Sequence, residues 1–276
     1  MAESEQRVEA GALPSALERF AELTAQLRGR RPVVFLDFDG TLTPIVPRPE
    51  QAEISSAMRA AVRRLGQCCT LAIVSGRDLA DVRAKVGIEE IFYAGSHGFH
   101  IAGPDGFGLE LQQGCRYLPA LDQAEQALLA QLGHIPGAQV ERKKFAVAIH
   151  FRRVDAGQVD AVTAVVDGVL AVSEGLRKTG GKMIFELRPD IDWDKGRALV
   201  WLLEKLGLDR DGAVPIYLGD DLTDEDAFRE LRRHGIGVLV REEARPTLAR
   251  YSLDSIQEVE LFLQRLADCF EATGCR

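Results

Sequence analysis

The sequence is poor in the features that mark secreted and membrane proteins. Its five cysteines are an odd number without a C-x-x-C pair, and they include the neighbours Cys68 and Cys69. We therefore expect reduced thiols and no disulfide framework. No run approaches the roughly 18 apolar residues of a membrane span, and Glu3 and Glu5 occupy the place of a basic leader. These absences predict a cytoplasmic protein without a membrane partner.

The sequence also has no excess of positive charge. The 34 Lys and Arg residues are outnumbered by 42 Asp and Glu residues, which gives a net charge of −8. This sign is wrong for neutralising phosphate backbones, so we expect no nucleic-acid partner. The content of 46% apolar and 28% charged residues is typical of a globular protein. The 276 residues predict two coupled domains, and the sequence favours a monomer without settling the oligomeric state.

Short apolar runs alternate with amphipathic stretches along most of the chain. A short, continuously apolar run is typical of a strand covered on both faces, and apolar spacings of three and four are typical of a helix. The alternation predicts an α/β fold with a doubly wound parallel sheet. The expected strands cover residues 33–36, 71–74, 91–94, 214–218 and 236–240, and the expected helices cover 13–28, 57–65, 78–86, 195–206 and 224–233.

The middle of the chain has a different pattern. Two stretches alternate apolar and polar side chains, which is typical of strands with one buried face. Two further stretches have helical spacing, so this part predicts an antiparallel sheet covered by helices on one side. We expect strands at 144–152 and 182–188, helices near 116–132 and 155–169, an α+β domain at 113–190, and a core domain formed by 1–112 and 191–276.

Acidic residues follow two of the predicted parallel strands. Asp37 and Asp39 end the first strand in the sequence D-F-D-G-T, where alternation directs both carboxylates to the same face. Asp220, Asp221 and Asp224 follow the fourth strand. Carboxylates that meet at one edge of a sheet raise each other's pKa unless a cation shares their charge. All-oxygen ligands without His or Cys indicate a hard ion, and we expect Mg²⁺.

Each of these motifs also has a structural interpretation. The acids after the fourth strand can cap a helix, with Thr223 and Asp226 as a capping box, and Ser75 can be a helix N-cap with Asp78 three residues later. Lys195 is harder to explain in this way, because a cation in the first turn of a helix opposes the helix dipole. An anion held between Lys195 and a metal explains it, which indicates a phosphoryl site.

Four motifs of the chain resemble those of the haloacid-dehalogenase-type phosphatases, in the same order. They are D-F-D-G-T-L from Asp37, the strand-terminal Ser75, Lys195, and G-D-D-x-x-x-D from Gly219. The insert lies between the second and third motifs, where C2-type cap domains occur in that superfamily. Finer signatures resemble the trehalose-6-phosphate phosphatases: G-S-H-G at 95–98, V-E-R-K at 140–143, H-F-R at 150–152, E-L-R-P at 186–189 and W-D-K-G at 193–196.

The resemblance implies roles for residues of the core. Asp37 matches the nucleophile that becomes an aspartyl phosphate, and Asp39 matches the general acid for the leaving sugar and then the base for water. Ser75 and Lys195 match residues that hold the transferring phosphoryl oxygens. The further substrate-binding candidates on the core are Thr41, Gly76, Arg77 and His97.

The resemblance also implies a metal site and a sugar site. Mg²⁺ is expected on Asp37, the Asp39 backbone carbonyl and Asp220, with Asp224, or alternatively Asp221, as the supporting acid. Charged side chains on the open face of the cap match the residues that bind sugar hydroxyls, although a solvated polar face is the structural alternative. The sugar-binding candidates are Glu141, Lys143, Arg152, Glu186 and Arg188.

The implied function is Mg²⁺-dependent hydrolysis of trehalose 6-phosphate to trehalose and phosphate, the dephosphorylation step of trehalose biosynthesis. Two alternatives remain open. One is a capped phosphatase for another sugar phosphate, such as sucrose phosphate or mannosyl-3-phosphoglycerate. The other is an inactive sugar-phosphate sensor or regulatory subunit, which the presence of Asp37, Asp39, Lys195 and Asp220 disfavours because a pure binder needs no nucleophile.

Overall fold

The computed structural model describes residues 7–181, 183–209, 212–241 and 245–273. The chain divides into two compact units, a core unit of Met1–Gly108 with Trp193–Arg276 and an inserted unit of Leu109–Asp192. This division lies a few residues outside the predicted 113–190 segment. No described helix is both long and apolar enough to cross a membrane. Cys275 and Lys182 lie outside the described residues, and the other four cysteines are thiols.

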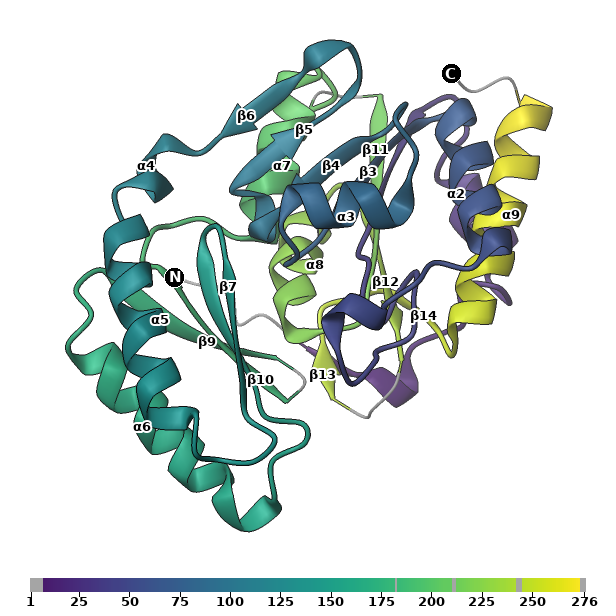
Figure 1. Cartoon of the computed structure of the whole chain (residues 1–276). Helices are drawn as coiled ribbons and strands as arrows, with labels where there is room; N and C mark the ends of the chain where they lie inside the picture. The colour runs from purple at the N-terminus through teal and green to yellow at the C-terminus, as the bar shows by residue number, and fades with distance from the viewer. Residues whose placement is uncertain (1–6, 182, 210–211, 242–244, 274–276) are drawn as a thin grey trace, which may run out of the picture. The chain divides into compact units, whose positions relative to one another are not determined.

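The core unit is built on a sheet of eight strands among the described residues (Figure 1). The strand order is β14-β12-β11-β2-β3-β4-β5-β6, parallel from β14 to β4, with β5 antiparallel to β4. This confirms the predicted α/β class. The strands are β2 (Arg31–Leu36), β3 (Thr70–Val74), β4 (Phe92–Gly95), β5 (His100–Ala102), β6 (Gly108–Glu110), β11 (Ala213–Gly219), β12 (Ile236–Val240) and β14 (Tyr251–Leu253), and a separate pair joins β1 (Val8–Glu9) to β13 (Pro246–Thr247).

The strand order changes direction beside β2. From β2 the chain continues through β3 and β4 on one side, and after the insert it continues through β11, β12 and β14 on the other. Val34 of β2 lies opposite Ile216 of β11, and the Asp37 amide donates to the Leu218 carbonyl at 2.9 Å. Ligands of doubly wound sheets bind at the carboxyl ends of strands at such a switch point. The fold therefore positions a site after β2 and β11.

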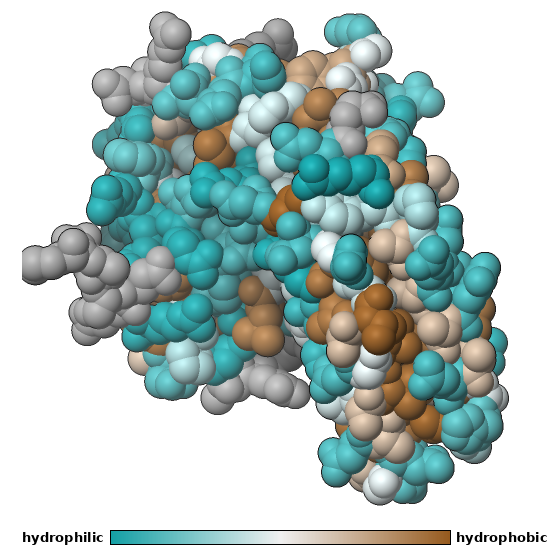
Figure 2. Space-filling model, turned by 90° about the vertical axis from the view of Figure 1, so that its left-hand side faces the viewer, coloured by the Kyte–Doolittle hydropathy of each residue, from teal (hydrophilic) through white to brown (hydrophobic). Residues whose placement is uncertain are grey.

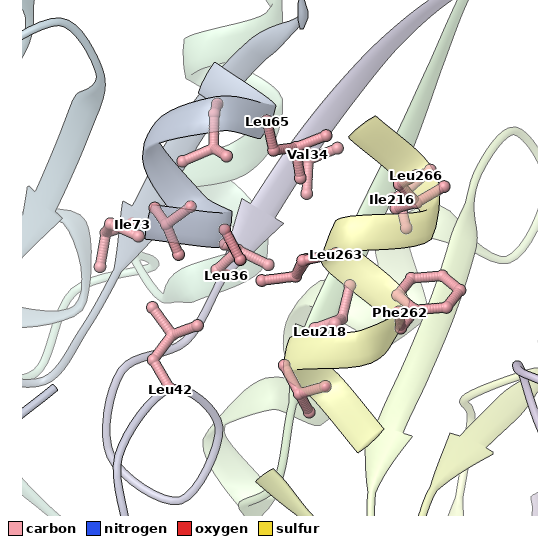
Figure 3. Packing of buried hydrophobic residues seen from close by; sticks show 14 of the residues in the cluster. Val34, Leu36, Leu42, Leu65, Ile73, Ile216, Leu218, Phe262, Leu263 and Leu266 are labelled. Atoms are coloured by element: carbon pink, nitrogen blue, oxygen red, sulfur yellow. The ribbon is translucent and has the colours of Figure 1, made fainter. Parts of the chain in front are cut away.

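Helices cover both faces of this sheet. On one face, Leu65 of α2 and Leu263 of α9 belong to the same buried cluster as Leu36 and Ile73 (Figure 3). On the other face, Tyr217 of β11 meets the ring of Phe228 in α8 edge-on. The helices of the core unit are α1 (Phe20–Ala25), α2 (Ser56–Cys68), α3 (Leu79–Val86), α7 (Lys195–Lys205), α8 (Glu225–Leu231) and α9 (Ile256–Thr273), of which α9 was not predicted.

The helix predicted over residues 13–28 is wrong in extent, because only α1 forms within it. The preceding residues bond to β14 instead: the Ala16 amide donates to the Ser252 carbonyl at 2.8 Å, and the Ser252 amide donates to the Pro14 carbonyl at 3.0 Å. Leu23 is nevertheless fully buried in the core cluster. The apolar spacing therefore predicted the burial of Leu23 correctly. The first residues of the predicted helix pair with β14 instead of forming helical turns.

The inserted unit is an antiparallel sheet of four strands among the described residues, with helices and its own apolar cluster. Val147 and Ile149 of the sheet pack there with Leu128 and Val166 of the helices. Two of the four strands were missed by the sequence prediction, β7 and β9. In order the strands are β7 (Gln139–Lys143), β8 (Ala146–His150), β10 (Ile184–Pro189) and β9 (Leu176–Gly181), and the helices are α4 (Gln112–Cys115), α5 (Leu118–Leu132) and α6 (Val159–Ala171).

The surface carries few large apolar side chains. Figure 2 shows mostly hydrophilic groups, with apolar groups gathered at the lower right of that view. Scattered apolar side chains are normal on a protein surface. Among the described residues, the exposed large apolar side chains are Val8, Leu129, Val172, Met183, Leu222 and Leu261.

Candidate active site

Three buried carboxylates meet beyond the carboxyl ends of β2 and β11. Asp37 follows β2, Asp220 follows β11, and Asp224 ends the 3-10 helix η6 (Leu222–Asp224). Each residue is at most 4% exposed, and one carboxylate oxygen of each lies within 4.8 Å of those of the other two. The structure therefore brings together acids that are more than 180 residues apart in the sequence.

The loop after Asp39 approaches Asp220 closely. Gly40 has a φ of 85°, and a Cβ added there would lie 2.2 Å from Asp220 Oδ2. Thr41 in the same loop donates from Oγ1 to Asp220 Oδ1 at 3.4 Å. Glycine is required here both by the left-handed backbone and by the lack of space. This explains why the sequence D-G-T follows the first carboxylate.

Lys195 is buried among these carboxylates. It is the first residue of α7, whose N-cap Asp194 accepts a hydrogen bond from the Arg197 amide at 2.8 Å. Its Nζ donates to Asp37 Oδ1 at 2.6 Å and to Asp224 Oδ1 at 2.8 Å. Burial alone lowers the pKa of Lys195, but the charges of Asp224 and Asp37 raise that pKa well above its ordinary value. Lys195 is therefore a charged group whose opposition to the helix dipole is offset by two anions.

Asp224 has hydrogen-bond donors on both carboxylate oxygens. Oδ1 accepts from Lys195 and from the Tyr217 hydroxyl at 2.6 Å, while Oδ2 accepts from the amides of Asp220 and Asp221, each at 2.9 Å. Burial raises the pKa of Asp224, but the charge and hydrogen bond of Lys195 outweigh it and hold the pKa below its ordinary value. Asp224 thus fixes Lys195 and the loop after β11.

The capping box at this loop differs from the sequence prediction. Asp221 is the N-cap of η6, its carboxylate accepts from the Leu222 amide at 2.7 Å, and Asp224 completes the box. The predicted box of Thr223 with Asp226 is wrong by two residues, because the helical turn begins directly after Asp221. Asp221 therefore has a capping role, whereas Asp224 contacts Lys195.

Asp37 is held in an environment that disfavours its charge. Burial raises its pKa well above the ordinary value, the charges of Asp224 and Asp220 act in the same direction, and Lys195 opposes them. A divalent cation on these oxygens would compensate this excess of negative charge. The donors are carboxylate oxygens, which Mg²⁺ prefers. Asp37 and Asp220 therefore fit a magnesium site.

Ser75 and Arg77 lie in the loop that follows β3. Ser75 is not a helix N-cap, because Asp78 occupies that position before α3, and Ser75 Oγ accepts from the Arg77 amide at 3.2 Å. The Arg77 side chain makes a two-pronged ion pair with Asp39, Nε to Oδ2 and Nη2 to Oδ1, both at 2.7 Å. It also donates to Asp81 at 2.7 Å. Arg77, predicted to bind substrate, thus contacts Asp39 in this structure.

His97 lies beside this loop in a strained turn. Ser96 and His97 have φ angles of 49° and 55°, which non-glycine residues rarely adopt. The turn is held by bonds from the Ser96 amide to the Arg77 carbonyl at 2.7 Å and from the His97 amide to the Ser75 carbonyl at 2.9 Å. A Cβ on Gly76 would lie 2.9 Å from the His97 ring. The turn therefore places His97 over Gly76.

The candidate sugar-binding residues lie in the inserted unit. Register places Glu141 of β7 and Glu186 of β10 opposite Ala148 of β8, so both acids share one face of the sheet. Glu186 is 6% exposed and accepts from Lys143 Nζ at 2.5 Å. Buried and paired charges do not match a solvated sheet face. Arg188 lies two residues further along β10, is also buried and shares that face, whereas Arg152 is exposed in the turn after β8.

Three residues near the site were not identified from the sequence. Tyr217 lies in the apolar run of β11 and has the pattern of a core residue, yet its hydroxyl bonds Asp224. The buried Glu225 forms an ion pair with the partly buried Arg245 beside the loop after β11. These two residues are 20 positions apart and belong to no common motif, so no local pattern connects them.

The fold and the site together define the class of the protein. The structure of the C. albicans trehalose-6-phosphate phosphatase C-terminal domain superposes with a TM-score of 0.80 at 24% identity, covering 93% of this chain and 98% of that chain. A haloacid dehalogenase-like hydrolase from Bacteroides thetaiotaomicron superposes with a TM-score of 0.59 at 18% identity, covering 88% and 99%. The chain therefore has the fold of these haloacid dehalogenase-like proteins.

Sequence comparison gives the family. The family model described as trehalose-phosphatase matches residues 35–257. A relative named probable trehalose-phosphate phosphatase 4, from Oryza sativa subsp. japonica, is 45% identical over 260 residues, which cover 92% of this chain and 71% of the relative. The chain belongs to the trehalose-phosphatase family and is a phosphoric monoester hydrolase. The resemblance stated from the motifs is confirmed.

Proposed function

We propose that the protein hydrolyses trehalose 6-phosphate to trehalose and phosphate. The observation that carries this proposal is the buried group of Asp37, Lys195 and Asp220 at the switch point of a trehalose-phosphatase chain. It combines a carboxylate for nucleophilic attack, a fixed cation for phosphoryl oxygens and acidic ligands for Mg²⁺. Bound there, Mg²⁺ would orient the phosphoryl group and draw off its negative charge.

The reaction has two chemical steps in this proposal. A carboxylate oxygen of Asp37 attacks phosphorus, the bond from phosphorus to the sugar oxygen breaks, and Asp39 gives its proton to that oxygen. Water then attacks the aspartyl phosphate, Asp39 takes a proton from it, and phosphate and the Asp37 carboxylate are released. Lys195 and Ser75 hold phosphoryl oxygens through both steps, while Thr41 contacts Asp220. Because Arg77 engages both oxygens of Asp39, this ion pair must loosen before Asp39 can carry a proton.

We further propose that the segment 113–190 recognises the sugar. Glu141 and Glu186 offer carboxylates on one sheet face, and carboxylates with Lys and Arg partners suit neighbouring hydroxyl groups. Lys143, Arg152 and Arg188 supply donors of the opposite charge. His97 and Gly76 of the core are the remaining substrate candidates. This division assigns bond breaking to the core unit and specificity to the inserted unit.

A phosphate-release panel tests the proposal. Trehalose 6-phosphate, sucrose 6-phosphate, mannosyl-3-phosphoglycerate and glucose 6-phosphate are offered to the protein with Mg²⁺ and with EDTA. We expect rapid release from trehalose 6-phosphate alone, abolished by EDTA and restored by excess Mg²⁺. Preference for another phosphate would contradict the substrate, and undiminished activity in EDTA would contradict the metal. Binding of trehalose 6-phosphate without phosphate release would indicate a sensor.

A further inference from the structure

An ion pair between the buried Glu225 and the partly buried Arg245 lies beside the loop that carries Asp220, and no step of the proposed reaction uses it. Glu225 is the first residue of α8 and is 3% exposed. Its carboxylate accepts from the Arg245 guanidinium, from Thr247 Oγ1 at 2.7 Å and from the Leu248 amide at 2.8 Å. A buried carboxylate with three donors is a fixed anchor for its partners.

Arg245 connects this anchor to the backbone of the site. While Nη1 bonds Glu225, Nη2 donates to the Asp220 carbonyl at 3.3 Å and to the Asp221 carbonyl at 3.1 Å. The amides of Asp220 and Asp221 donate to Asp224. The peptide groups of this loop are thus held through their amides by Asp224 and through their carbonyls by Arg245.

The positive charge of Arg245 beside Asp220 is unfavourable for cation binding. Its presence there needs another explanation, and holding the backbone in place is one. A guanidinium beside Asp220 and Asp221 repels a dication on the Asp220 carboxylate, which weakens metal binding. The fork of Arg245, however, fixes the backbone from which that carboxylate projects, and fixing a ligand before binding removes an ordering cost. Groups that orient metal ligands in this way strongly affect metal affinity.

We propose that Glu225 and Arg245 are positioning residues that preorganise Asp220 for a divalent cation. This inference rests on the proposed function, because it assumes that Asp220 is a metal ligand. The alternative is a tether for the chain after Arg245, since Glu225 also holds Thr247 and Leu248. A tether affects the stability of the fold, whereas a positioning pair also sets the affinity for the metal.

Arg245→Lys separates the two roles, because lysine keeps the charge and loses the fork. Arg241→Lys is a matched control: Arg241 pairs with the exposed Asp254, at 2.7 Å from Nε to Oδ1, and donates to the Ala10 carbonyl at 3.2 Å. Mg²⁺ binding to the full chain is measured by calorimetry without substrate, and folding is checked by circular dichroism and melting temperature. We expect the Mg²⁺ Kd of Arg245→Lys to rise about tenfold, within the range seen for residues that orient metal ligands, and that of Arg241→Lys to change less than twofold.

Glu225→Gln provides a second variant if Arg245→Lys folds poorly. Glutamine keeps one acceptor oxygen, for either Thr247 or Leu248, and loses the charge that orients Arg245, so Mg²⁺ affinity should again fall. Unchanged or tighter Mg²⁺ binding in a folded Arg245→Lys or Glu225→Gln variant would overturn the inference, even if the melting temperature drops. If the parent protein binds no Mg²⁺, the proposed metal site fails and this inference fails with it. If the parent binds Mg²⁺ and the variants bind it equally well, the metal site stands and only the positioning role of Glu225 and Arg245 is contradicted.

Discussion

Asp37 illustrates how the chemistry of a site conflicts with the stability of a fold. The residue is 4% exposed and shares its surroundings with Asp220 and Asp224, so its pKa is raised well above the ordinary value, first by burial. A group whose charged form is disfavoured in the folded state destabilises that state at neutral pH. The raised pKa is therefore the cost of keeping the proposed nucleophile and the proposed metal ligands together.

Asp37→Asn should remove turnover and stabilise the metal-free protein. Loss of a covalent nucleophile should lower kcat by at least about 10⁴-fold, measured by phosphate release. Loss of the buried charge should raise stability by about 0.5–2 kcal/mol, measured in EDTA at neutral pH. Asp209→Asn, at an exposed position outside the helices, serves as control and should change neither quantity.

The stability gain of Asp37→Asn should depend on pH. The folded pKa of Asp37 is raised, so its penalty is present above that pKa and absent below the unfolded pKa, which is about 3.9. The advantage of asparagine should therefore shrink as the pH falls toward that value. A variant that retains turnover within tenfold would exclude Asp37 as nucleophile, and a destabilised variant would show that its bond to Lys195 outweighs burial.

The first turn of α7 couples helix capping to the site. Asp194 Oδ1 accepts from the Arg197 amide at 2.8 Å, and the next residue, Lys195, projects its ammonium between Asp37 and Asp224. A helix end that frays moves its first side chains most. The cap therefore holds the position of a proposed catalytic residue as well as the helix.

Asp194→Ala should lower both stability and turnover, whereas Ser55→Ala should lower stability alone. Ser55 caps α2 by accepting from the Met58 amide at 3.0 Å, and α2 contributes no residue to the site. Each loss of a cap should cost about 1 kcal/mol of unfolding free energy, measured by urea denaturation. Only Asp194→Ala should reduce kcat, and Asp194→Ser should recover most of it. Equal kcat in the two alanine variants would show that the cap does not position Lys195.

The sequence predicted correctly those strands that are buried on both faces, because their burial produces a continuous apolar run. The run Val33 to Leu36 is covered on both faces and is strand β2. The strands β7 and β9 were missed because Glu141, Arg177 and Lys178 give them a polar pattern, and their partner strands rather than their own apolar spacing define them. Local patterns therefore predicted the core sheet better than the edges of the inserted sheet.

The same limit applies to the site. Asp37, Ser75 and Lys195 stand at ends of elements, where a charged or hydroxyl group interrupts an apolar pattern, so the sequence alone marks them as candidates. Arg245 could not be identified in this way. It acts through hydrogen bonds to the backbone carbonyls of Asp220 and Asp221, and no pattern of side chains in the sequence indicates such contacts. Contacts to backbone atoms between distant segments become visible only in the folded chain.

The chain combines two units with separate apolar cores. The cluster around Leu36 and Leu263 belongs to the core unit, and the cluster around Val147 and Val166 belongs to the inserted unit. Separate cores allow one unit to change its polar residues without disturbing the other's packing. Phosphoryl chemistry and sugar recognition should therefore respond independently to substitutions.

Glu186→Ala should test this division of roles. Glu186 accepts from Lys143 in the inserted unit, and its loss should remove contacts to sugar hydroxyls remote from phosphorus. Such binding energy positions the reacting group, so kcat/KM for trehalose 6-phosphate should fall by roughly 10²-fold, or about 3 kcal/mol of transition-state binding. Hydrolysis of a small aryl phosphate, which has no sugar, should stay within a few-fold of the parent.

Asp39→Asn and Glu174→Ala supply the two controls for this measurement. Asp39→Asn should impair both substrates, because proton transfer serves any leaving group that needs it, although the aryl phosphate should lose less since its leaving oxygen is a weaker base. Glu174 is an exposed acid of the inserted unit, and its alanine variant should affect neither substrate. Equal damage to both substrates by a folded, Mg²⁺-binding Glu186→Ala would place Glu186 in the catalytic machinery or its support. Unchanged kcat/KM for both substrates in Glu186→Ala would contradict a sugar-binding role. Loss of a residue that binds the disaccharide must impair hydrolysis of trehalose 6-phosphate more than hydrolysis of an aryl phosphate, which has no sugar.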